Sequence, residues 1–285
     1  MKKIILSLVS ALMLLSCSEP KRTSEPTIFV TIPPLKALVE EITAGDFKVK
    51  VLVPEGASPE SYEPTTQQIA SLNSADLILS TGLINFEQTL TQSIEDEERV
   101  VNLSEGIELI EGSCSHHHHG HNHSHGIDPH IWTSPRALHT VVRNIDNALH
   151  RTFPDSTKYC DKAKRVMARL TSLDGYCGSL LRSANVRAIM IYHPAYTYLV
   201  RDYGIEQITI EHDGKEPTPR QLTELVEKGR KLGIKRIFHQ PQYSPDKLEA
   251  IATEIGAEVV MCNPLSEDIE TEIRSVVEQI AKSHE

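Results

Sequence analysis

The chain has 285 residues, with 29 Lys and Arg against 39 Asp and Glu, so its formal net charge is −10 at pH 7. This charge argues against nucleic acid and anionic membrane surfaces as partners, because both attract basic proteins. Beyond a short N-terminal segment, about 260 residues are left, which is enough for two domains of ordinary size with hydrophobic cores.

The N-terminal segment, residues 1–17, predicts a bacterial lipoprotein signal peptide. Two lysines precede an apolar run from Ile4 to Leu15, which is too short to span a bilayer and is closed by Ser16 and Cys17. We expect cleavage before Cys17, lipidation of its thiol and a polar linker over residues 18–26. The protein would then be periplasmic or on the cell surface, held at the membrane by its lipid alone. A plain secretory signal, with an incidental cysteine, is the alternative.

Strand and helix patterns alternate in the first half of the chain. Short apolar runs predict strands over residues 28–32, 49–53, 76–80 and 100–103, with helices beginning at Pro33 and Thr66 and another before the fourth strand. Such repeated units are typical of a parallel sheet with helices on both faces. A loop rich in proline over residues 54–64 follows the second strand, at the strand end where open α/β sheets bind ligands.

A long helical stretch separates the two halves. An amphipathic helix begins after Pro135, residues 153–155 interrupt it, and a periodic stretch then continues to about Ser183. A helix of that length would measure about 40 Å and can bridge two lobes. Cys160 and Cys177 lie within it roughly 25 Å apart, too far to form a disulfide. The partners of Cys114 and Cys262 stay open.

The second half repeats the alternation of strands and helices seen in the first. Strands are predicted over residues 187–192, 207–210, 236–239 and 258–261, with helical patterns between them and a closing helix. We therefore expect an α/β protein of two lobes, each with a mainly parallel sheet flanked by helices. The lobes would cover residues 27–152 and 185–285, joined by a rigid helix over residues 153–184, and the polar residues at the strand ends would face one cleft.

A histidine-rich stretch interrupts the first lobe at residues 113–126. It is polar, contains glycines and has no apolar period, so it cannot bury a face and predicts a loop of metal ligands. An engineered purification tag would usually be terminal and unbroken, whereas this tract is internal and interrupted. Cys114 can join it as a soft ligand. Its histidines are His116, His117, His118, His119, His121, His123 and His125.

Two further histidines occupy more rigid surroundings. His130 follows Asp128-Pro129 and precedes Ile131-Trp132, and His193 begins the segment His193-Pro194-Ala195-Tyr196 at the end of a predicted strand. Metal sites are built from imidazoles held in place in this way. For His130 alone an ordinary loop histidine would be favoured, but the neighbouring tract and the second such histidine reverse that preference. The remaining candidates are expected to be solvated residues on helices: His139, His150 and His284.

Several motifs lie in order along the chain: Ile32-Pro33-Pro34-Leu35, residues 52–59, Tyr62-Glu63-Pro64-Thr65, the histidine stretch, residues 128–132, His193-Pro194-Ala195-Tyr196 and Glu216-Pro217-Thr218-Pro219. Together they resemble the metal-binding class of ABC-transporter solute-binding proteins, most of all its zinc members. The resemblance covers essentially the whole chain after the signal segment. It implies two α/β lobes with one metal ion between them, in a monomeric, non-enzymatic protein that delivers the ion to a membrane permease and its ATPase.

The resemblance places metal ligands at Glu60, His130, His193 and, as the weakest member, Asn263. Glu60 stands where the family usually has His, but a carboxylate oxygen binds Zn²⁺ at a distance close to that of an imidazole nitrogen. A solvated loop acid is the alternative at that position. Asn263 stands where some members have Asp; its neutral amide is a poor zinc donor, and a structural turn residue is favoured there. Gln240 replaces a glutamate that usually lies close to the ligands.

The expected cargo is Zn²⁺. Two nitrogens with one or two oxygens would also hold Mn²⁺ or Fe²⁺, but the affinity order favours zinc, and the histidine tract suits metals that prefer imidazole. The sequence therefore predicts the high-affinity zinc-binding component of an ABC uptake transporter. The alternatives are a manganese or iron protein of the same class, a surface zinc buffer or adhesin without transport, and a zinc hydrolase. A hydrolase is disfavoured because no His-Glu-x-x-His helix or further placed acid or base is found.

Overall fold

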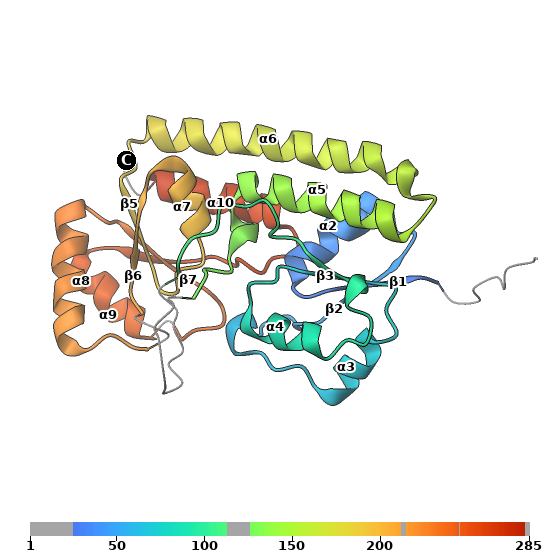
Figure 1. Cartoon of the computed structure of the whole chain (residues 1–285). Coiled ribbons are helices and arrows are strands. Elements are labelled where there is room, and N and C mark those ends of the chain that lie inside the picture. Colours follow the sequence, from blue (N-terminus) through green and yellow to red (C-terminus); the bar gives the residue numbers. More distant parts are fainter. Residues whose placement is uncertain (1–24, 113–125, 212–214, 245, 283–285) are drawn as a thin grey trace, which may run out of the picture.

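The computed structural model describes residues 25–112, 126–211, 215–244 and 246–282, and its strands form two four-stranded parallel sheets (Figure 1). The predicted α/β class with two mainly parallel sheets is confirmed. The first sheet has the order β2-β1-β3-β4 and the second the order β6-β5-β7-β8, so both halves use one topology. The strands are β1 (Thr27–Val30), β2 (Lys48–Val51), β3 (Leu77–Ser80), β4 (Val100–Asn102), β5 (Ala188–Ile191), β6 (Glu206–Thr209), β7 (Arg236–His239) and β8 (Glu258–Met261).

Central strands such as β3 (LILS) and β5 (AIMI) read as nearly continuous apolar runs because helices cover both of their faces. All four residues of β3 and all four of β5 are buried. In the first half the helices are α2 (Pro33–Thr43), α3 (Thr66–Leu72) and α4 (Asn85–Gln92). A proline at its start and a buried face of Leu35, Leu38, Val39 and Ile42 define α2, as the sequence predicts.

Two antiparallel helices connect the halves. Helix α5 (Pro135–Thr152) is capped by Ser134, whose hydroxyl accepts the amide N–H of Ala137 at 3.2 Å. Helix α6 (Cys160–Ser183) has 24 residues, about 36 Å of helix, and runs alongside both halves (Figure 1). The α-helix begins later than the predicted start near Ser156, because residues 156–159 form a 3₁₀ turn.

The second half adds α7 (Thr197–Tyr203), α8 (Pro219–Leu232), α9 (Asp246–Ile255) and α10 (Ile269–Lys282). Helices α8 and α9 pack together on the second sheet, whereas α10 packs against α6 (Figure 1). None of the helices in the described part of the chain is both long enough and apolar enough to cross a bilayer.

The main hydrophobic core is continuous between the halves. One cluster joins Ile28 of β1, Val141 of α5, Leu170 of α6, Ile191 of β5 and Val277 of α10. A smaller cluster lies between the second sheet and helices α8 and α9. The lobe boundaries predicted at residues 152 and 185 stay predictions, and the shared core favours a rigid frame over two freely moving bodies. The predicted signal peptide and Cys17 lie outside the described residues.

Candidate metal centre

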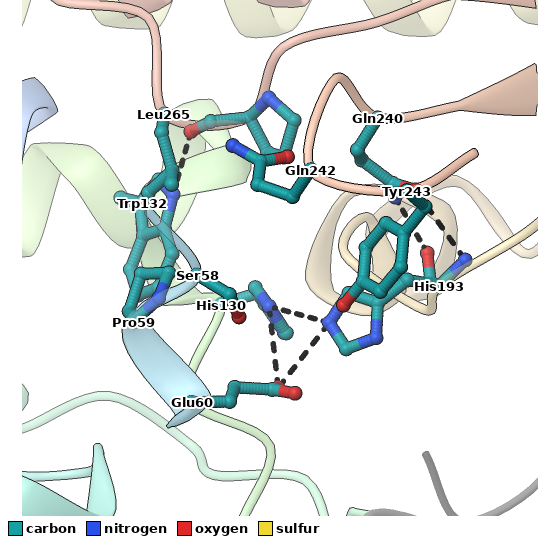
Figure 2. Close-up of a pocket in the computed structure, with 11 residues that line it drawn as sticks. Ser58, Pro59, Glu60, His130, Trp132, His193, Gln240, Gln242, Tyr243 and Leu265 are labelled. Carbon is teal, nitrogen blue, oxygen red and sulfur yellow. Dashed lines mark hydrogen bonds and ion pairs between the residues drawn. The ribbon is translucent and has the colours of Figure 1, made fainter. Parts of the chain in front are cut away.

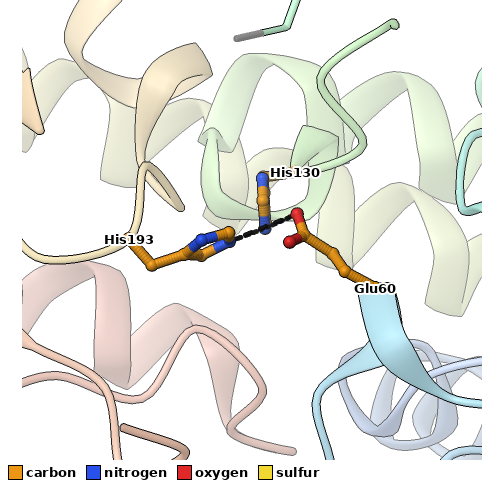
Figure 3. Close-up of side chains that lie close together, drawn as sticks. All are labelled: Glu60, His130 and His193. Carbon is orange, nitrogen blue, oxygen red and sulfur yellow. Dashed lines mark hydrogen bonds and ion pairs between the residues drawn. The ribbon is translucent and has the colours of Figure 1, made fainter. Parts of the chain in front are cut away.

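Three separate segments of the chain bring Glu60, His130 and His193 together, and Figure 3 shows their side chains pointing toward one another. Glu60 lies in a 3₁₀ turn after β2, His130 directly precedes another 3₁₀ turn, and His193 follows β5. Nε2 of His193 lies 3.2 Å from Oε1 of Glu60 and 3.3 Å from Nε2 of His130. Nε2 of His130 lies 3.7 Å from the same carboxylate oxygen. Ligand atoms held tetrahedrally at about 2.1 Å from an ion would lie roughly 3.4 Å apart, so the three atoms surround a metal-sized space.

The three groups are withdrawn from solvent. His130 and His193 are each 5% exposed. Oε1 of Glu60 is buried and makes no regular hydrogen bond to any described residue, although it faces both imidazoles. A buried carboxylate oxygen is costly unless a cation balances it, and at this position either a protonated His193 or a metal ion can do so. The arrangement therefore fits a metal ligand better than the solvated loop acid.

The ring of His130 is fixed by its own turn. Oδ1 of Asp128 accepts the backbone N–H of His130 at 2.9 Å and lies 2.9 Å from the ring Nδ1. The hydroxyl of Thr133 donates to the carbonyl oxygen of His130 at 2.9 Å. With Nδ1 engaged by a carboxylate, Nε2 is left to face the metal-sized space, which is the usual arrangement of a ligating histidine.

The ring of His193 is fixed by residues distant in sequence. Nδ1 lies 2.7 Å from Oε1 of Glu211, a buried residue that follows β6, and the ring of Tyr243 stacks on the imidazole at 5.4 Å. Gln240 contacts the main chain instead: its Nε2 donates to the carbonyl oxygen of His193 at 2.7 Å. Because an amide can make that contact, the glutamine in place of the usual glutamate still supports His193.

The ionisable groups of this site shift the pKa values of one another. Burial opposes ionisation of Glu60, but His193 and His130 outweigh it and the pKa of Glu60 is lowered. Burial likewise lowers the pKa of His193, yet Glu211 and Glu60 overcome this and raise it to about 10. The pKa of Asp128 is lowered because the attraction of His130 exceeds the effect of burial. Without metal, a proton on His193 therefore partly balances the surrounding carboxylates.

A small cavity opens onto the three ligand atoms (Figure 2). Its free volume is about 20 Å³, which is room for an ion or one water molecule. It is lined by Ser58, Pro59, Glu60, His130, Trp132, His193, Gln240, Gln242, Tyr243, Pro264 and Leu265.

Asn263 is not among the residues that line this cavity. Its amide Oδ1 accepts the N–H of Leu265 at 3.2 Å, and its own N–H donates to Glu272 at 2.7 Å. These bonds are those of a turn residue. The geometry thus supports the structural role that the sequence favoured and gives no support to Asn263 as a fourth ligand.

The histidine tract, residues 113–125, and its Cys114 lie outside the described residues. Its flanks are described: Glu111 pairs with Ile127 in an antiparallel bridge, and the N–H of Gly112 donates to the carbonyl of Gly126 at 2.5 Å. The tract therefore leaves and rejoins the fold at one point, directly before Asp128.

Two carboxylates that hold the imidazoles were not singled out by the sequence. Asp128 carried a usable signal, since it precedes His130 by two residues and can fold back on it. Glu211 carried none beyond its place at a strand end, because its contact depends on the pairing of β5 with β6. Other polar residues also follow strands of the second sheet: His239 is buried and Glu216 is exposed, while His212 and Asp213 lie outside the described residues.

Residues 28–282 match the family model ZnuA, described as zinc-uptake complex component A periplasmic. The chain belongs to this family.

Individual relatives agree with this membership. The chain is 30% identical over 251 residues to the high-affinity zinc uptake system protein ZnuA of Bacillus subtilis, covering 84% of this chain and 78% of that protein. It is 27% identical to the zinc-binding lipoprotein AdcA of Streptococcus pneumoniae over 93% of this chain, but spans only 56% of AdcA. A crystal structure of ZnuA superposes with a TM-score of 0.83 at 30% identity, covering 92% of this chain and 100% of that one.

Proposed function

We propose that this protein captures Zn²⁺ with Glu60, His130 and His193 and delivers it to the permease and ATPase of an ABC uptake transporter. The observation that carries the proposal is the buried convergence of one carboxylate oxygen and two imidazole nitrogens within 4.8 Å of one another. Membership of the ZnuA family and the zinc-related names of the relatives support the choice of ion and of process.

The donor set suits zinc. Two imidazoles and one carboxylate form a normal three-ligand zinc set, with a fourth position open to water or to the second oxygen of Glu60. The affinity order places Zn²⁺ above Mn²⁺ and Fe²⁺ for such ligands. A divalent ion would replace the proton of His193 as the charge that balances Glu60, Asp128 and Glu211. Capture would therefore release a proton near neutral pH.

Two peripheral features belong to this proposal. The histidine tract within residues 113–126 would collect Zn²⁺ close to the centre, since its flanking bridge leads directly to Asp128. Cys17 would carry a lipid that anchors the protein outside the cytoplasm, consistent with the lipoprotein name of AdcA. Collection by the tract requires neutral imidazoles.

Release would involve a modest tilt of the two halves and not a wide hinge. Beside the metal centre, Nε1 of Trp132 donates to the carbonyl of Pro264 at 2.8 Å, and the hydroxyl of Thr133 donates to the carbonyl of Ala195 at 2.9 Å. These bonds cross between the halves and supplement the shared core. Movement is therefore expected to be small and local to the loops.

The test is a competition titration with zinc and manganese on wild type, Glu60→Ala and Glu63→Ala. Glu63 is an exposed carboxylate in the same loop and serves as the matched control. Wild type should prefer zinc, Glu60→Ala should bind it more than roughly 10-fold more weakly, and Glu63→Ala should match wild type. Unchanged binding by Glu60→Ala would remove Glu60 from the ligand set.

The transport step needs a cellular readout. Cells that need this protein to grow under zinc chelation should stop growing when its gene is deleted. Wild type and Glu63→Ala should restore that growth, and Glu60→Ala should not. Tight zinc binding in vitro without any rescue by wild type would favour a surface zinc buffer over a transporter component.

A further inference from the structure

A second group of metal-binding side chains lies where α5 ends and α6 begins. It consists of Asp146 and His150 in the last part of α5 and Cys160, the first residue of α6. One possible ligand atom of each lies within 4.8 Å of the others. Sequence reasoning treated His150 as a solvated helix residue and considered Cys160 only for a disulfide.

The fold accounts for this placement. Asp146 and His150 are four residues apart on α5 and so share one helix face. Residues 153–159 then reverse the chain, and α6 returns against α5 with Cys160 opposite that face. The cluster thus joins two helices across a tight connection.

The distances are those of ligands around a small ion. Sγ of Cys160 lies 3.5 Å from Oδ2 of Asp146, and Nδ1 of His150 lies 3.6 Å from Oδ1 of Asp146. Without an ion, Nδ1 of His150 is also within hydrogen-bond distance of the carbonyl oxygen of Asp146, at 3.0 Å, and metal binding at Nδ1 would replace that bond. Nitrogen, oxygen and sulfur atoms bound tetrahedrally to zinc would lie roughly 3.3 to 3.6 Å apart, so only small shifts are needed to close the site.

Asp146 supplies an independent sign of a missing cation. Its Oδ1 is buried and makes no hydrogen bond to any described residue, although Oδ2 accepts from Cys160. The cluster is nevertheless reachable from solvent, because the side chain of Asp146 is 16% exposed and that of His150 is 36% exposed. A carboxylate oxygen is therefore aimed into the cluster while solvent can still bring an ion to it.

We propose that Asp146, His150 and Cys160 form a second metal site, which takes a divalent cation with affinity for thiolates, namely Zn²⁺. Binding would form a bond from Sγ to the metal, and the thiol proton would pass to water; the imidazole and carboxylate supply the other two bonds, and water the fourth. The mixed sulfur, nitrogen and oxygen donors favour Zn²⁺ and Cd²⁺ over Mn²⁺ or Mg²⁺.

This site is separate from the centre formed by Glu60, His130 and His193. Helix α5 begins at Pro135, close to His130, and His150 lies fifteen residues beyond Pro135, roughly 22 Å along the helix axis. An ion here would join the C-terminus of α5 to the N-terminus of α6. These helices run alongside both halves, so binding would stabilise the frame without occupying the transport site.

The test follows alkylation of Cys160 by iodoacetamide in the full chain, read out on its own peptide by mass spectrometry. Micromolar free Zn²⁺ should slow the reaction of Cys160 at least tenfold relative to chelator, because a metal-bound thiolate is a poor nucleophile. His150→Ala and Asp146→Ala should each abolish the protection. Thermal unfolding without metal verifies that these variants are folded.

Two controls separate the local site from indirect effects. Asp161→Ala removes a neighbouring carboxylate whose side chain is 80% exposed, and it should leave the protection unchanged. Glu60→Ala should also leave it unchanged, which makes this outcome independent of the proposed transport site. Absence of protection in wild type, its survival in both His150→Ala and Asp146→Ala, or its loss in Glu60→Ala would overturn the proposal.

Discussion

The two imidazoles of the metal centre are held alike by carboxylates of different origin. Asp128 lies two residues before His130 and fixes it within a single turn, whereas Glu211 reaches His193 from the loop after the neighbouring strand. The first contact is encoded locally, and the second exists only when β5 and β6 pair in register. The orientation of His130 therefore depends on its own turn, whereas that of His193 depends on the second sheet.

The same comparison has an electrostatic side. Nδ1 of His193 faces Glu211 and its Nε2 faces Glu60, so this imidazole lies between two carboxylates and its pKa rises to about 10. In the metal-free protein His193 is therefore protonated at neutral pH. Under the proposed function, the exchange of a proton for a metal ion would therefore take place at His193.

Removal of either imidazole should have the largest effect. His130→Ala and His193→Ala should each weaken zinc binding by more than roughly 100-fold, because loss even of a residue that supports a ligand costs about 10–100-fold. A chromophoric zinc chelator measures this by competition. His139→Ala, a half-buried histidine on α5, is the control and should bind as wild type. If one of the two variants bound zinc with near-normal affinity, the histidine replaced in that variant would not be a ligand.

Exchange of the supporting carboxylates should have an intermediate effect and distinguish the two sides. Asp128→Asn and Glu211→Gln should each weaken zinc binding at neutral pH by about 10–100-fold, since a neutral amide oxygen is a weaker acceptor for the ring than a charged carboxylate. Glu211→Gln should also flatten the pH dependence of affinity, because the pKa of His193 falls and fewer protons compete. Parallel titrations between pH 6 and 9 measure both effects; an unaltered slope in Glu211→Gln would contradict the role given to Glu211.

The stability of the metal-free protein should change with pH in a defined direction. His193 binds its proton more tightly in the folded state, where its pKa is about 10, than in the unfolded chain, where a histidine titrates near 6.5. This stabilisation is fully present below pH 6.5 and is lost as the pH rises towards 10. Thermal unfolding in chelator should show a larger fall across that window for wild type than for Glu211→Gln. Equal slopes would refute the assignment.

Deletion of residues 113–126 should have the smallest effect on the centre. The tight zinc site formed by Glu60, His130 and His193 should remain with its affinity nearly unchanged, while the total amount of zinc bound falls. In wild type the additional capacity should decline below about pH 6.5, where histidines become protonated. Isothermal titration of both proteins at two pH values measures this. Loss of the tight site on deletion would show that the tract helps to build it.

Patterns within single segments were sufficient for much of the fold. Apolar runs predicted β7 and β8 with the bounds observed, and the helical period predicted α6 up to Ser183. The start of α6 was less predictable, because the period of apolar residues does not distinguish a 3₁₀ turn from the first α-helical turn.

At the candidate site, too, patterns within single segments predicted some residues and not others. The structure brings together Glu60, His130 and His193, which motifs had indicated one by one, and Asp128 is adjacent in sequence. Glu211 could not be predicted because its partner is set by strand order and register. The cluster of Asp146, His150 and Cys160 was not predicted for a similar reason, since it forms only when two helices fold back on each other.

The most direct test of the metal centre is a crystal structure of the zinc-loaded protein with anomalous data collected at the zinc edge. We predict a peak within about 2.0–2.2 Å of Oε1 of Glu60 and of Nε2 of His130 and His193. An anomalous peak at the cavity with Glu60 turned away from it, or no peak at these three atoms, would contradict this ligand set.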